Sequence, residues 1–283
     1  SVGTPANNTL YVVGSITANQ NATISAESVA LVDSGTAAVA TDITVGNART
    51  LTFSGTIADD NVGGFSSAFD KKGAGTLVLS GDNSAMTGSS TVTAGILDVR
   101  HVNALGDRSV VAQVTTVATG GFLVSNQANF ITAGAVAGDI SVSAGGSIGV
   151  AAPGVATIGN LNVNSLTLQG GSNIVLKIWD GAQVAGIGYD KLDLGTLDLT
   201  GASNTSRITI RLISMSAANA FGDSTLVKPV DQAGFRTFDI GTYENTPGVN
   251  VSDLFRMMRL SSPTRIVPPR MPACGWSTST TAR

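Results

Sequence analysis

Residues 76–81 read Thr-Leu-Val-Leu-Ser-Gly, so that two leucines stand two positions apart and a glycine closes the run. Apolar residues with a period of two predict a β-strand with one buried face, and glycine permits a sharp turn after it. The pattern Leu-x-(Leu or Phe)-x-Gly occurs again at residues 51–55, 166–170 and 197–201. The pattern therefore predicts a short strand that is repeated along the chain.

The spacing of these repeats predicts how the strands are arranged. Leu51 and Leu77 are 26 residues apart, and Leu166 and Leu197 are 31 apart. Spacings of about 20–50 residues mark solenoids and propellers, in which strands stacked at ~4.8 Å hide one another's apolar faces. Helical spacing is nearly absent, so an all-β chain is expected. With about 22–25 residues in each coil, residues 1–255 would form roughly ten coils.

Composition favours a narrow parallel core over the competing architecture, a globular β-sandwich. The 283 residues include 34 Gly but only two Trp, three Tyr and nine Phe, and aromatic rings usually fill the wide core of a sandwich. Tight Asn-Gly or Asp-Gly turns are missing apart from Asp180-Gly181. The formal charge of -3 argues against a broadly basic nucleic-acid binder, and no apolar run approaches the 18 residues of a transmembrane helix.

One window carries a family signature. Residues 72–83 read KGAGTLVLSGDN, residues 87–97 read TGSSTVTAGIL, and residues 103–106 read NALG. The window resembles the autotransporter-associated β-strand repeat of bacterial passenger and surface proteins, although Met86 stands where an aromatic residue is common. The resemblance implies a right-handed parallel β-helix (a β-solenoid), export to the cell surface, and adhesive or structural work. Asn83 is expected to form a ladder or to cap a turn.

The chain divides into three regions in this interpretation. Residues 1–70 form an N-terminal β segment that could donate a strand to a neighbouring copy, and residues 71–255 form the solenoid. Residues 256–283 hold five Arg, no Asp or Glu and four of the eight Pro, so they are expected to be an irregular basic tail. Alternatively, this tail lies against the acidic body of the protein. The single cysteine, Cys274, is expected to be an incidental thiol or to pair between molecules.

No catalytic, cofactor-binding or metal-binding residue is predicted. The only histidine, His101, is expected to line a turn rather than to act as a general base. Asp193 and Asp198 have no obvious basic partner and are expected to be solvated, with a cation site or catalysis as alternatives. Asp59-Asp60-Asn61 could bind calcium but fits a polar turn better. Gly73-x-Gly75 precedes a strand rather than a helix, so a phosphate-binding loop is not expected.

The sequence is compatible with three functions. The leading hypothesis is a non-catalytic extracellular structural protein, a subunit that self-associates through β-contacts into a homopolymer such as a surface layer, sheath or filament. The alternative is a secreted adhesin or passenger that binds a host or matrix ligand, for which Tyr11, Trp179 and Tyr189 offer only scattered rings. The third is a polysaccharide-active enzyme that uses Asp193 or Asp198. None of the three requires a cofactor.

Overall fold

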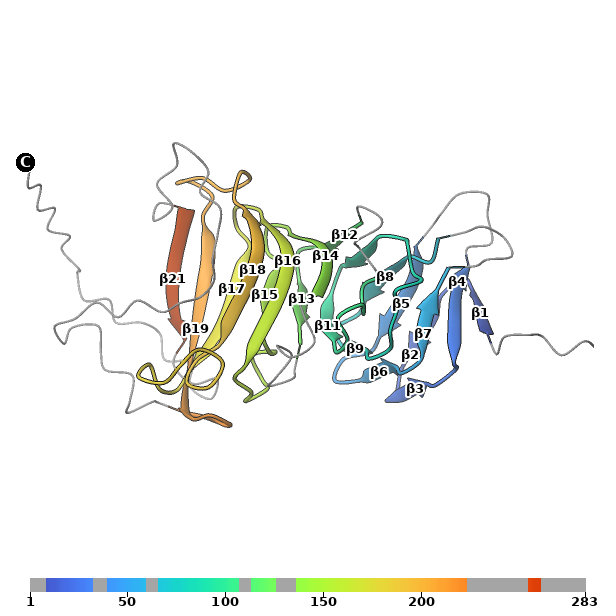
Figure 1. Ribbon diagram of the computed structural model, residues 1–283, viewed down its shortest axis with the longest axis horizontal. Coiled ribbons are helices and arrows are strands. Elements are labelled where there is room, and N and C mark those ends of the chain that lie inside the picture. The colour runs from blue at the N-terminus through green and yellow to red at the C-terminus, as the bar shows by residue number, and fades with distance from the viewer. Residues whose placement is uncertain are drawn as a thin grey trace, which may run out of the picture.

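The computed structural model describes residues 9–32, 40–59, 66–106, 113–125, 136–222 and 254–260. These residues wind into an elongated stack of strands, with the N-terminal strands at one end and β21 at the other (Figure 1). Strands of successive coils pair in parallel, and the one antiparallel pair described is β20 with β19. The fold is a parallel β-helix, which confirms the fold class expected from the repeated pattern.

Three sheets run along the stack. Sheet A is short and contains β1 (Thr9–Val13), β4 (Ser28–Val32) and β7 (Thr56–Ala58). Sheet B contains β2 (Ile16–Ala18), β5 (Thr41–Val45), β8 (Phe69–Lys72), β10 (Ser90–Val92), β12 (Val114–Val117), β14 (Val136–Val142), β16 (Asn160–Leu168) and β18 (Lys191–Asp198). Sheet C contains β3 (Ala22–Ile24), β6 (Thr50–Phe53), β9 (Thr76–Leu79), β11 (Gly95–Val99), β13 (Gly121–Val124), β15 (Ser147–Gly149), β17 (Asn173–Ile178), β19 (Ile208–Ala217), β20 (Ala220–Phe221) and β21 (Phe255–Leu260).

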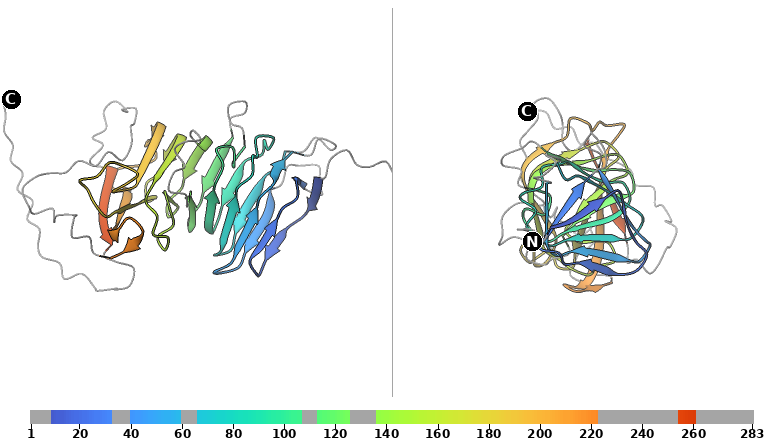
Figure 2. Two further views of the ribbon diagram at one scale, coloured as in Figure 1. Left: turned by 60° about the horizontal axis from the view of Figure 1, so that its bottom comes forward. Right: turned by 90° about the vertical axis from the view of Figure 1, so that its right-hand side faces the viewer.

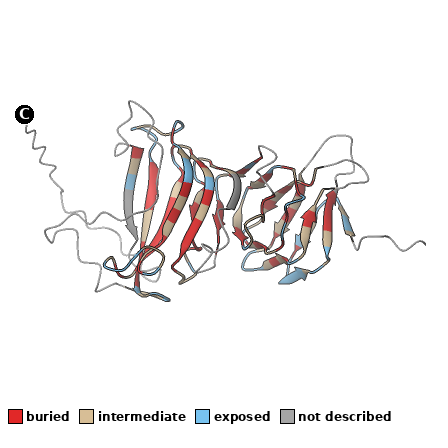
Figure 3. Cartoon of the chain, in the orientation of Figure 1, coloured by how far each residue is buried: buried red, intermediate tan, exposed pale blue. Residues whose placement is uncertain are grey.

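Inward-facing residues of neighbouring coils stand directly above one another. The clearest column in sheet C consists of Leu51, Leu77, Leu97, Leu123, Ile148, Ile174 and Ile210. All of these side chains belong to one continuous buried cluster. Buried positions, red in Figure 3, occur on strands along the whole stack. Each fully buried aliphatic side chain contributes about 1.5–3 kcal/mol. A stack of such columns holds the coils together with few aromatic rings.

The repeated sequence pattern corresponds to stacked partners, as the spacing predicted. Leu51 pairs with Leu77 in sheet C, and Leu166 pairs with Leu197 in sheet B. The two pairs therefore lie in different sheets, although they share one pattern. The described residues form eight coils with strands in sheets B and C, and β21 adds a strand of sheet C beyond the eighth. Excursions such as residues 179–190, between β17 and β18, lengthen individual coils.

The region boundaries expected from the sequence do not coincide with structural boundaries. From Thr9 onward the strands before residue 70 are coils of the same stack, since β2 and β5 extend the sheet that contains β8. At the other end β21 pairs in parallel with β19, so residues 256–260 of the expected irregular tail continue sheet C. The ladder hydrogen bonds of β19 extend to these residues because no proline precedes Pro263 in the tail. Residues 261–283, with Cys274, lie outside the described residues.

The cross-section of the helix changes along its length. The first three coils have strands in all three sheets, whereas sheet A has no described strand beyond β7. In coils four and five, turns at residues 82–88 and 101–106 take the place of a sheet A strand. The views in Figure 2 show the stack from the side and along its length.

The corner between sheets B and C is built on glycine. Gly95, Gly120 and Gly145 all have positive φ angles, between 72° and 87°. The backbone N–H of Gly95 donates to the carbonyl of Gly120, and that of Gly120 donates to Gly145, at 3.2 Å in both cases. A Cβ on Gly95 would meet the carbonyl oxygens of Gly73 and Gly75 at 2.4 and 2.5 Å. The close approach of successive corners therefore requires glycine at this position.

Candidate functional site

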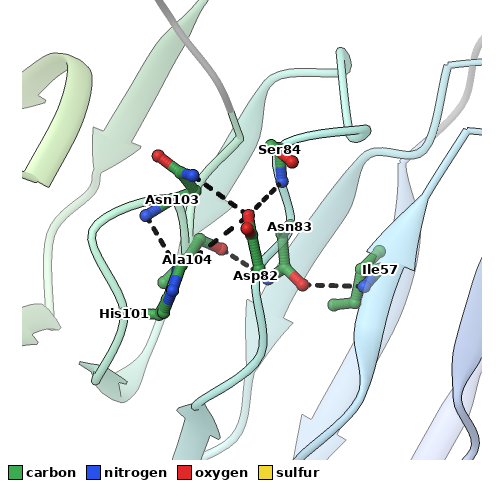
Figure 4. A network of polar contacts seen from close by, with 7 residues as sticks. All are labelled: Ile57, Asp82, Asn83, Ser84, His101, Asn103 and Ala104. Carbon is green, nitrogen blue, oxygen red and sulfur yellow. Dashed lines mark hydrogen bonds and ion pairs between the residues drawn. The ribbon is translucent and has the colours of Figure 1, made fainter.

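Asn83 joins three coils at the place where sheet A ends (Figure 4). Its Oδ1 accepts a hydrogen bond from the backbone N–H of Ile57 in β7, at 2.7 Å. Its Nδ2 donates to the carbonyl of Ala104 in the next coil, at 2.6 Å. The side chain is buried, so these bonds satisfy backbone groups that water does not reach. Asn83 extends the hydrogen-bond ladder of sheet A by one coil, which confirms its expected laddering role.

A surface network surrounds Asn83. The Asp82 carboxylate accepts hydrogen bonds from the Asn103 side-chain amide and from the Ser84 backbone N–H, both at 3.0 Å. The bond from Asn103, followed by that from Ser84, holds the pKa of Asp82 below its usual range although burial opposes the shift. These bonds fasten the turn at residues 82–88 to the turn at residues 101–106.

His101 lines the second of these turns. Its Nδ1 accepts a hydrogen bond from the Asn103 backbone N–H at 3.2 Å and lies 3.9 Å from Asp82 Oδ1. An Nδ1 that accepts a backbone N–H belongs to the neutral tautomer with its proton on Nε2. A histidine general base of the serine-hydrolase type instead keeps its proton on Nδ1 and its lone pair on Nε2. The structure thus places His101 at a turn, as expected.

The two candidate aspartates of the enzyme hypothesis lie on β18, outside the apolar core. We expected no basic partner, but Lys191 Nζ lies 3.4 Å from Asp193 Oδ2, because residues two apart on a strand project from the same face. Asp198 is exposed, and its Oδ1 accepts the backbone N–H of Thr200 at 2.8 Å.

Asp59 is fully engaged in hydrogen bonds within the protein. Its Oδ1 accepts the backbone N–H groups of Ser67 and Thr87, at 2.7 and 2.9 Å, and its Oδ2 accepts the Thr87 hydroxyl. Asp59 therefore ties coil three to coil four, as a polar turn residue would. Asp60 and Asn61, the other members of the calcium hypothesis, lie outside the described residues.

The Gly73-x-Gly75 corner uses its backbone groups internally. The N–H of Gly75 donates to the carbonyl of Val45 at 3.0 Å, and the carbonyl of Gly73 accepts from Lys71 Nζ at 2.8 Å. A phosphate-binding loop needs free N–H groups that point at the ligand. At this corner the N–H of Gly75 is used within the protein instead.

Lys71 projects into the core of the β-helix. Its register partners in sheet B are Ile43 and Val92, which are buried in the main apolar cluster. The ammonium group donates to the carbonyls of Lys72, Gly73 and Ala94 at 2.8–3.0 Å, so its three hydrogen bonds lie on the inner side of the corner. Burial lowers the pKa of Lys71 to about 8, and the negative charge of Asp70 opposes this effect.

Two further buried polar residues, Lys177 and Asp190, lie on the outer side of sheet C. The Asp190 carboxylate accepts the backbone N–H groups of Gly159 and Lys177 at 3.1 and 2.8 Å, and Lys177 Nζ donates to the carbonyl of Ala151 at 2.6 Å. Burial raises the pKa of Asp190 to about 7, and burial lowers the pKa of Lys177 to about 8. The pair fastens residues 151–159 and the end of the 179–190 excursion onto β17.

The 179–190 excursion, which we call the apolar loop, presents exposed aliphatic side chains. Val184 and Ile187 are 63% and 57% exposed. Trp179 Nε1 donates to the carbonyl of Ile187 at 2.8 Å, and the carbonyl of Gly188 accepts the backbone N–H of Trp179 at 2.9 Å. Residues 181–189 contain no charged residue. The loop is thus internally bonded and carries an uncharged apolar tip.

Of the three aromatic residues considered for ligand binding, the structure brings two together. Trp179 and Tyr189 stand at the two ends of the apolar loop, and Tyr189 forms isolated β-bridges with Ile178 and Ala185. Tyr11 lies on β1 at the opposite end of the stack (Figure 1).

The fold and these contacts define a β-helical scaffold whose coils are fastened by side chains. Residues 69–99 match the family model described as Passenger-associated-transport-repeat, so the chain carries an autotransporter-associated repeat. The matched residues span β8 to β11 and include Asn83. No curated protein and no solved structure was found to match the chain.

Within the described part of the chain, no group of three or more His, Cys, Asp or Glu side chains could hold a metal ion. No described helix is long and apolar enough to cross a membrane.

Sequence reasoning missed the buried polar residues Lys71, Lys177 and Asp190. For Lys71 a signal existed, because it stands two positions after Phe69 and so shares the inward face of β8. For Lys177 and Asp190 no local signal existed, because their hydrogen-bond partners are 13 to 31 residues away.

Proposed function

We propose that the chain is the β-helical passenger of a secreted bacterial surface protein and that it works by adhesion rather than by catalysis. The observation that carries this proposal is the match of residues 69–99 to a passenger-associated repeat, on consecutive coils of a parallel β-helix. Passengers act outside the cell, so an extracellular or cell-surface location is part of the proposal.

The apolar loop is the part of this scaffold best suited to contact a ligand. Val184 and Ile187 project from a loop that its own hydrogen bonds hold in shape, so binding would cost little ordering entropy. Residues 181–189 lack the basic side chains that attract anionic lipid surfaces. We therefore propose a protein ligand with an apolar pocket.

The filament hypothesis is the weaker candidate because the repeat that residues 69–99 match is described as passenger-associated. The observations in favour of the enzyme hypothesis are the half-exposed Asp193 next to Lys191 and the exposed carboxylate of Asp198. Adhesion without turnover is the function that these features support best.

An adhesion assay tests the proposal. Beads coated with the purified chain should adhere to extracellular-matrix protein or host cells, and Ile187→Asp should reduce adhesion at least several-fold. Thr116→Asp, on the outer face of sheet B, is the matched control and should leave adhesion unchanged. Absence of adhesion by the unmodified chain across a panel of matrix proteins and host cells would overturn the proposal, as would cleavage of a polysaccharide that Asp193→Asn abolishes.

A further inference from the structure

Three arginine side chains gather on the outer face of sheet C. β19 and β21 pair in parallel there, at the end of the stack opposite β1 (Figure 1). Ile208 and Ile210 of β19 are buried in the main apolar cluster. The alternate positions, Thr209 and Arg211, therefore point away from that core. Arg207, two positions before Thr209, is exposed directly in front of the strand.

β21 supplies the third arginine. Arg256 is in register with Thr209, and its Nη2 donates to the Thr209 hydroxyl at 3.2 Å. Its guanidinium therefore lies beside Thr209, the position midway between Arg207 and Arg211. The Nε of Arg207 donates to the carbonyl of Asn204 at 3.0 Å, which orients that side chain. We call Arg207, Arg211 and Arg256 the arginine row.

The positive charge of the arginine row is not compensated by described neighbours. Residues 199–222 and 254–260 contain no Asp or Glu. The adjacent outward positions on β17, Asn173 and Val175, are uncharged. Among the described residues, every ion pair is formed by side chains outside the row. The row is thus a local excess of positive charge on a chain whose formal charge is -3.

Guanidinium groups in this arrangement suit a chain of tetrahedral anions. Arginine is always charged, and its planar fork donates two parallel hydrogen bonds to oxygens of a phosphate. A sulfate ester presents the same tetrahedron of oxygens. Strand residues rise ~3.3 Å each, so the interval from Arg207 to Arg211 spans about 13 Å. One anionic group cannot reach across that span, whereas successive groups of an extended chain can.

The size of the row distinguishes between polyanions. Recognition of anionic lipid surfaces is typical of clusters of about four to eight basic residues, and duplex DNA binders commonly contact about six to ten phosphates. A row of three matches a ligand that needs few contacts in a line. We propose that the arginine row binds a sulfated polysaccharide that lies along β19. The row lies beside the beginning of β17, whereas the apolar loop follows its end, so this inference does not depend on the apolar loop.

Binding to heparin, a sulfated polysaccharide, tests the proposal. Surface plasmon resonance at physiological ionic strength should show binding of the unmodified chain. Arg207→Gln, Arg211→Gln and Arg256→Gln should each weaken it by about fivefold, and the triple substitution should remove it. The exposed Arg49, in the turn between β5 and β6, is the matched control, and Arg49→Gln should bind as the unmodified chain does. Circular dichroism checks that each variant is folded.

Three outcomes would overturn the proposal. The first is that the unmodified chain does not bind heparin. The second is that the triple variant retains its affinity, which would assign binding to basic residues outside the row. The third is that the unmodified chain binds anionic phospholipid vesicles or duplex DNA as tightly as heparin. Ile187→Asp should leave heparin binding unchanged, which separates this test from the adhesion assay.

Discussion

At the scale of single residues, Asn83 shows how a side chain can replace a strand. Sheet A stops at β7, and the N–H of Ile57 would otherwise have no partner on the open side. A buried N–H without a partner costs about 1–3 kcal/mol. The carboxamide suits this position because it carries both an acceptor and a donor, so it can receive a bond from one coil and pass another to the next.

Replacement of Asn83 should therefore be costly. Asn83→Ala leaves the Ile57 N–H and the Ala104 carbonyl without their partner, and we expect a loss of about 2–4 kcal/mol in the free energy of unfolding. Urea unfolding measures this loss. The exposed neighbour Ser84 is the control, and Ser84→Ala should change stability by less than about 0.5 kcal/mol. Equal effects of the two substitutions would contradict the bridging role.

The buried Asp190 should give stability a distinctive pH dependence. Its pKa is about 7 in the folded protein and near 3.8 when unfolded, so the folded state binds the proton more tightly between these values. Stability should therefore fall as the pH rises from about 4 to about 7. A tenfold difference in proton affinity is worth about 1.4 kcal/mol, so the fall should amount to about 2–4 kcal/mol.

Urea unfolding at several pH values, with the unmodified chain compared to Asp190→Asn, isolates this contribution. The variant cannot titrate and should lack the fall between pH 4 and 7, while the half-exposed Asp193→Asn should retain it. Lys71 and Lys177 have pKa values of about 8 in the folded protein, below the usual lysine value of 10.5. The unfolded chain therefore binds more protons between these values, so these lysines should make stability rise from about pH 8 to about pH 10.5. A pH profile of Asp190→Asn that matches the unmodified chain would exclude the assignment to Asp190.

At the scale of elements, the glycine corner sets how closely successive coils approach. Gly95→Ala combines a positive φ angle with contacts of 2.4 and 2.5 Å to carbonyl oxygens of the preceding coil. We expect it to destabilise the fold by more than about 3 kcal/mol, or to prevent folding. Gly14 is a matched control, because its φ is +93° but nothing lies within 4 Å of an added Cβ. Gly14→Ala should cost only about 1–2 kcal/mol in urea unfolding.

Sequence periodicity predicts the elements that repeat and fails for those that do not. Leu77 and Leu79 predict β9, and the distance from Leu51 to Leu77 predicts the stacking, because both depend on a local alternation and a fixed spacing. β21 was not predicted, because the Met and Arg residues of Phe255–Leu260 carry no alternation typical of the other strands. The covering of Lys177 by residues 151–159 was also unpredictable, since it depends on an excursion rather than on the repeat.

The candidate site was predicted to the same limited extent. Asn83 follows directly from the repeat signature, in which a polar residue after the strand glycine must satisfy the turn. The partners of Asn83 were not predicted, since Ile57 and Ala104 lie 26 and 21 residues away. Their identity depends on the length of each coil, which sequence spacing gives only approximately.

At the scale of the whole molecule, each coil contacts only its neighbours, so stability should vary along the stack. The amides of β2 and β3, in the first described coil, should exchange with solvent faster than those of β9 and β11, which have a described coil on both sides. Hydrogen exchange followed by mass spectrometry measures this difference. Uniform exchange along the stack would contradict the nearest-neighbour description.

The uneven strand lengths have a mechanical consequence. β10 and β11 contain three and five residues, whereas β16 and β19 contain nine and ten. The ladder hydrogen bonds run along the long axis, so a tensile load on the two ends pulls on every coil-to-coil junction in series. Among the described junctions that pair in both sheets B and C, those around β10 to β13 have the fewest paired residues to share that load, and neither sheet A nor long strands reinforce them. Under shear at a surface the rod would yield near its middle, and the two tethered ends would stay folded.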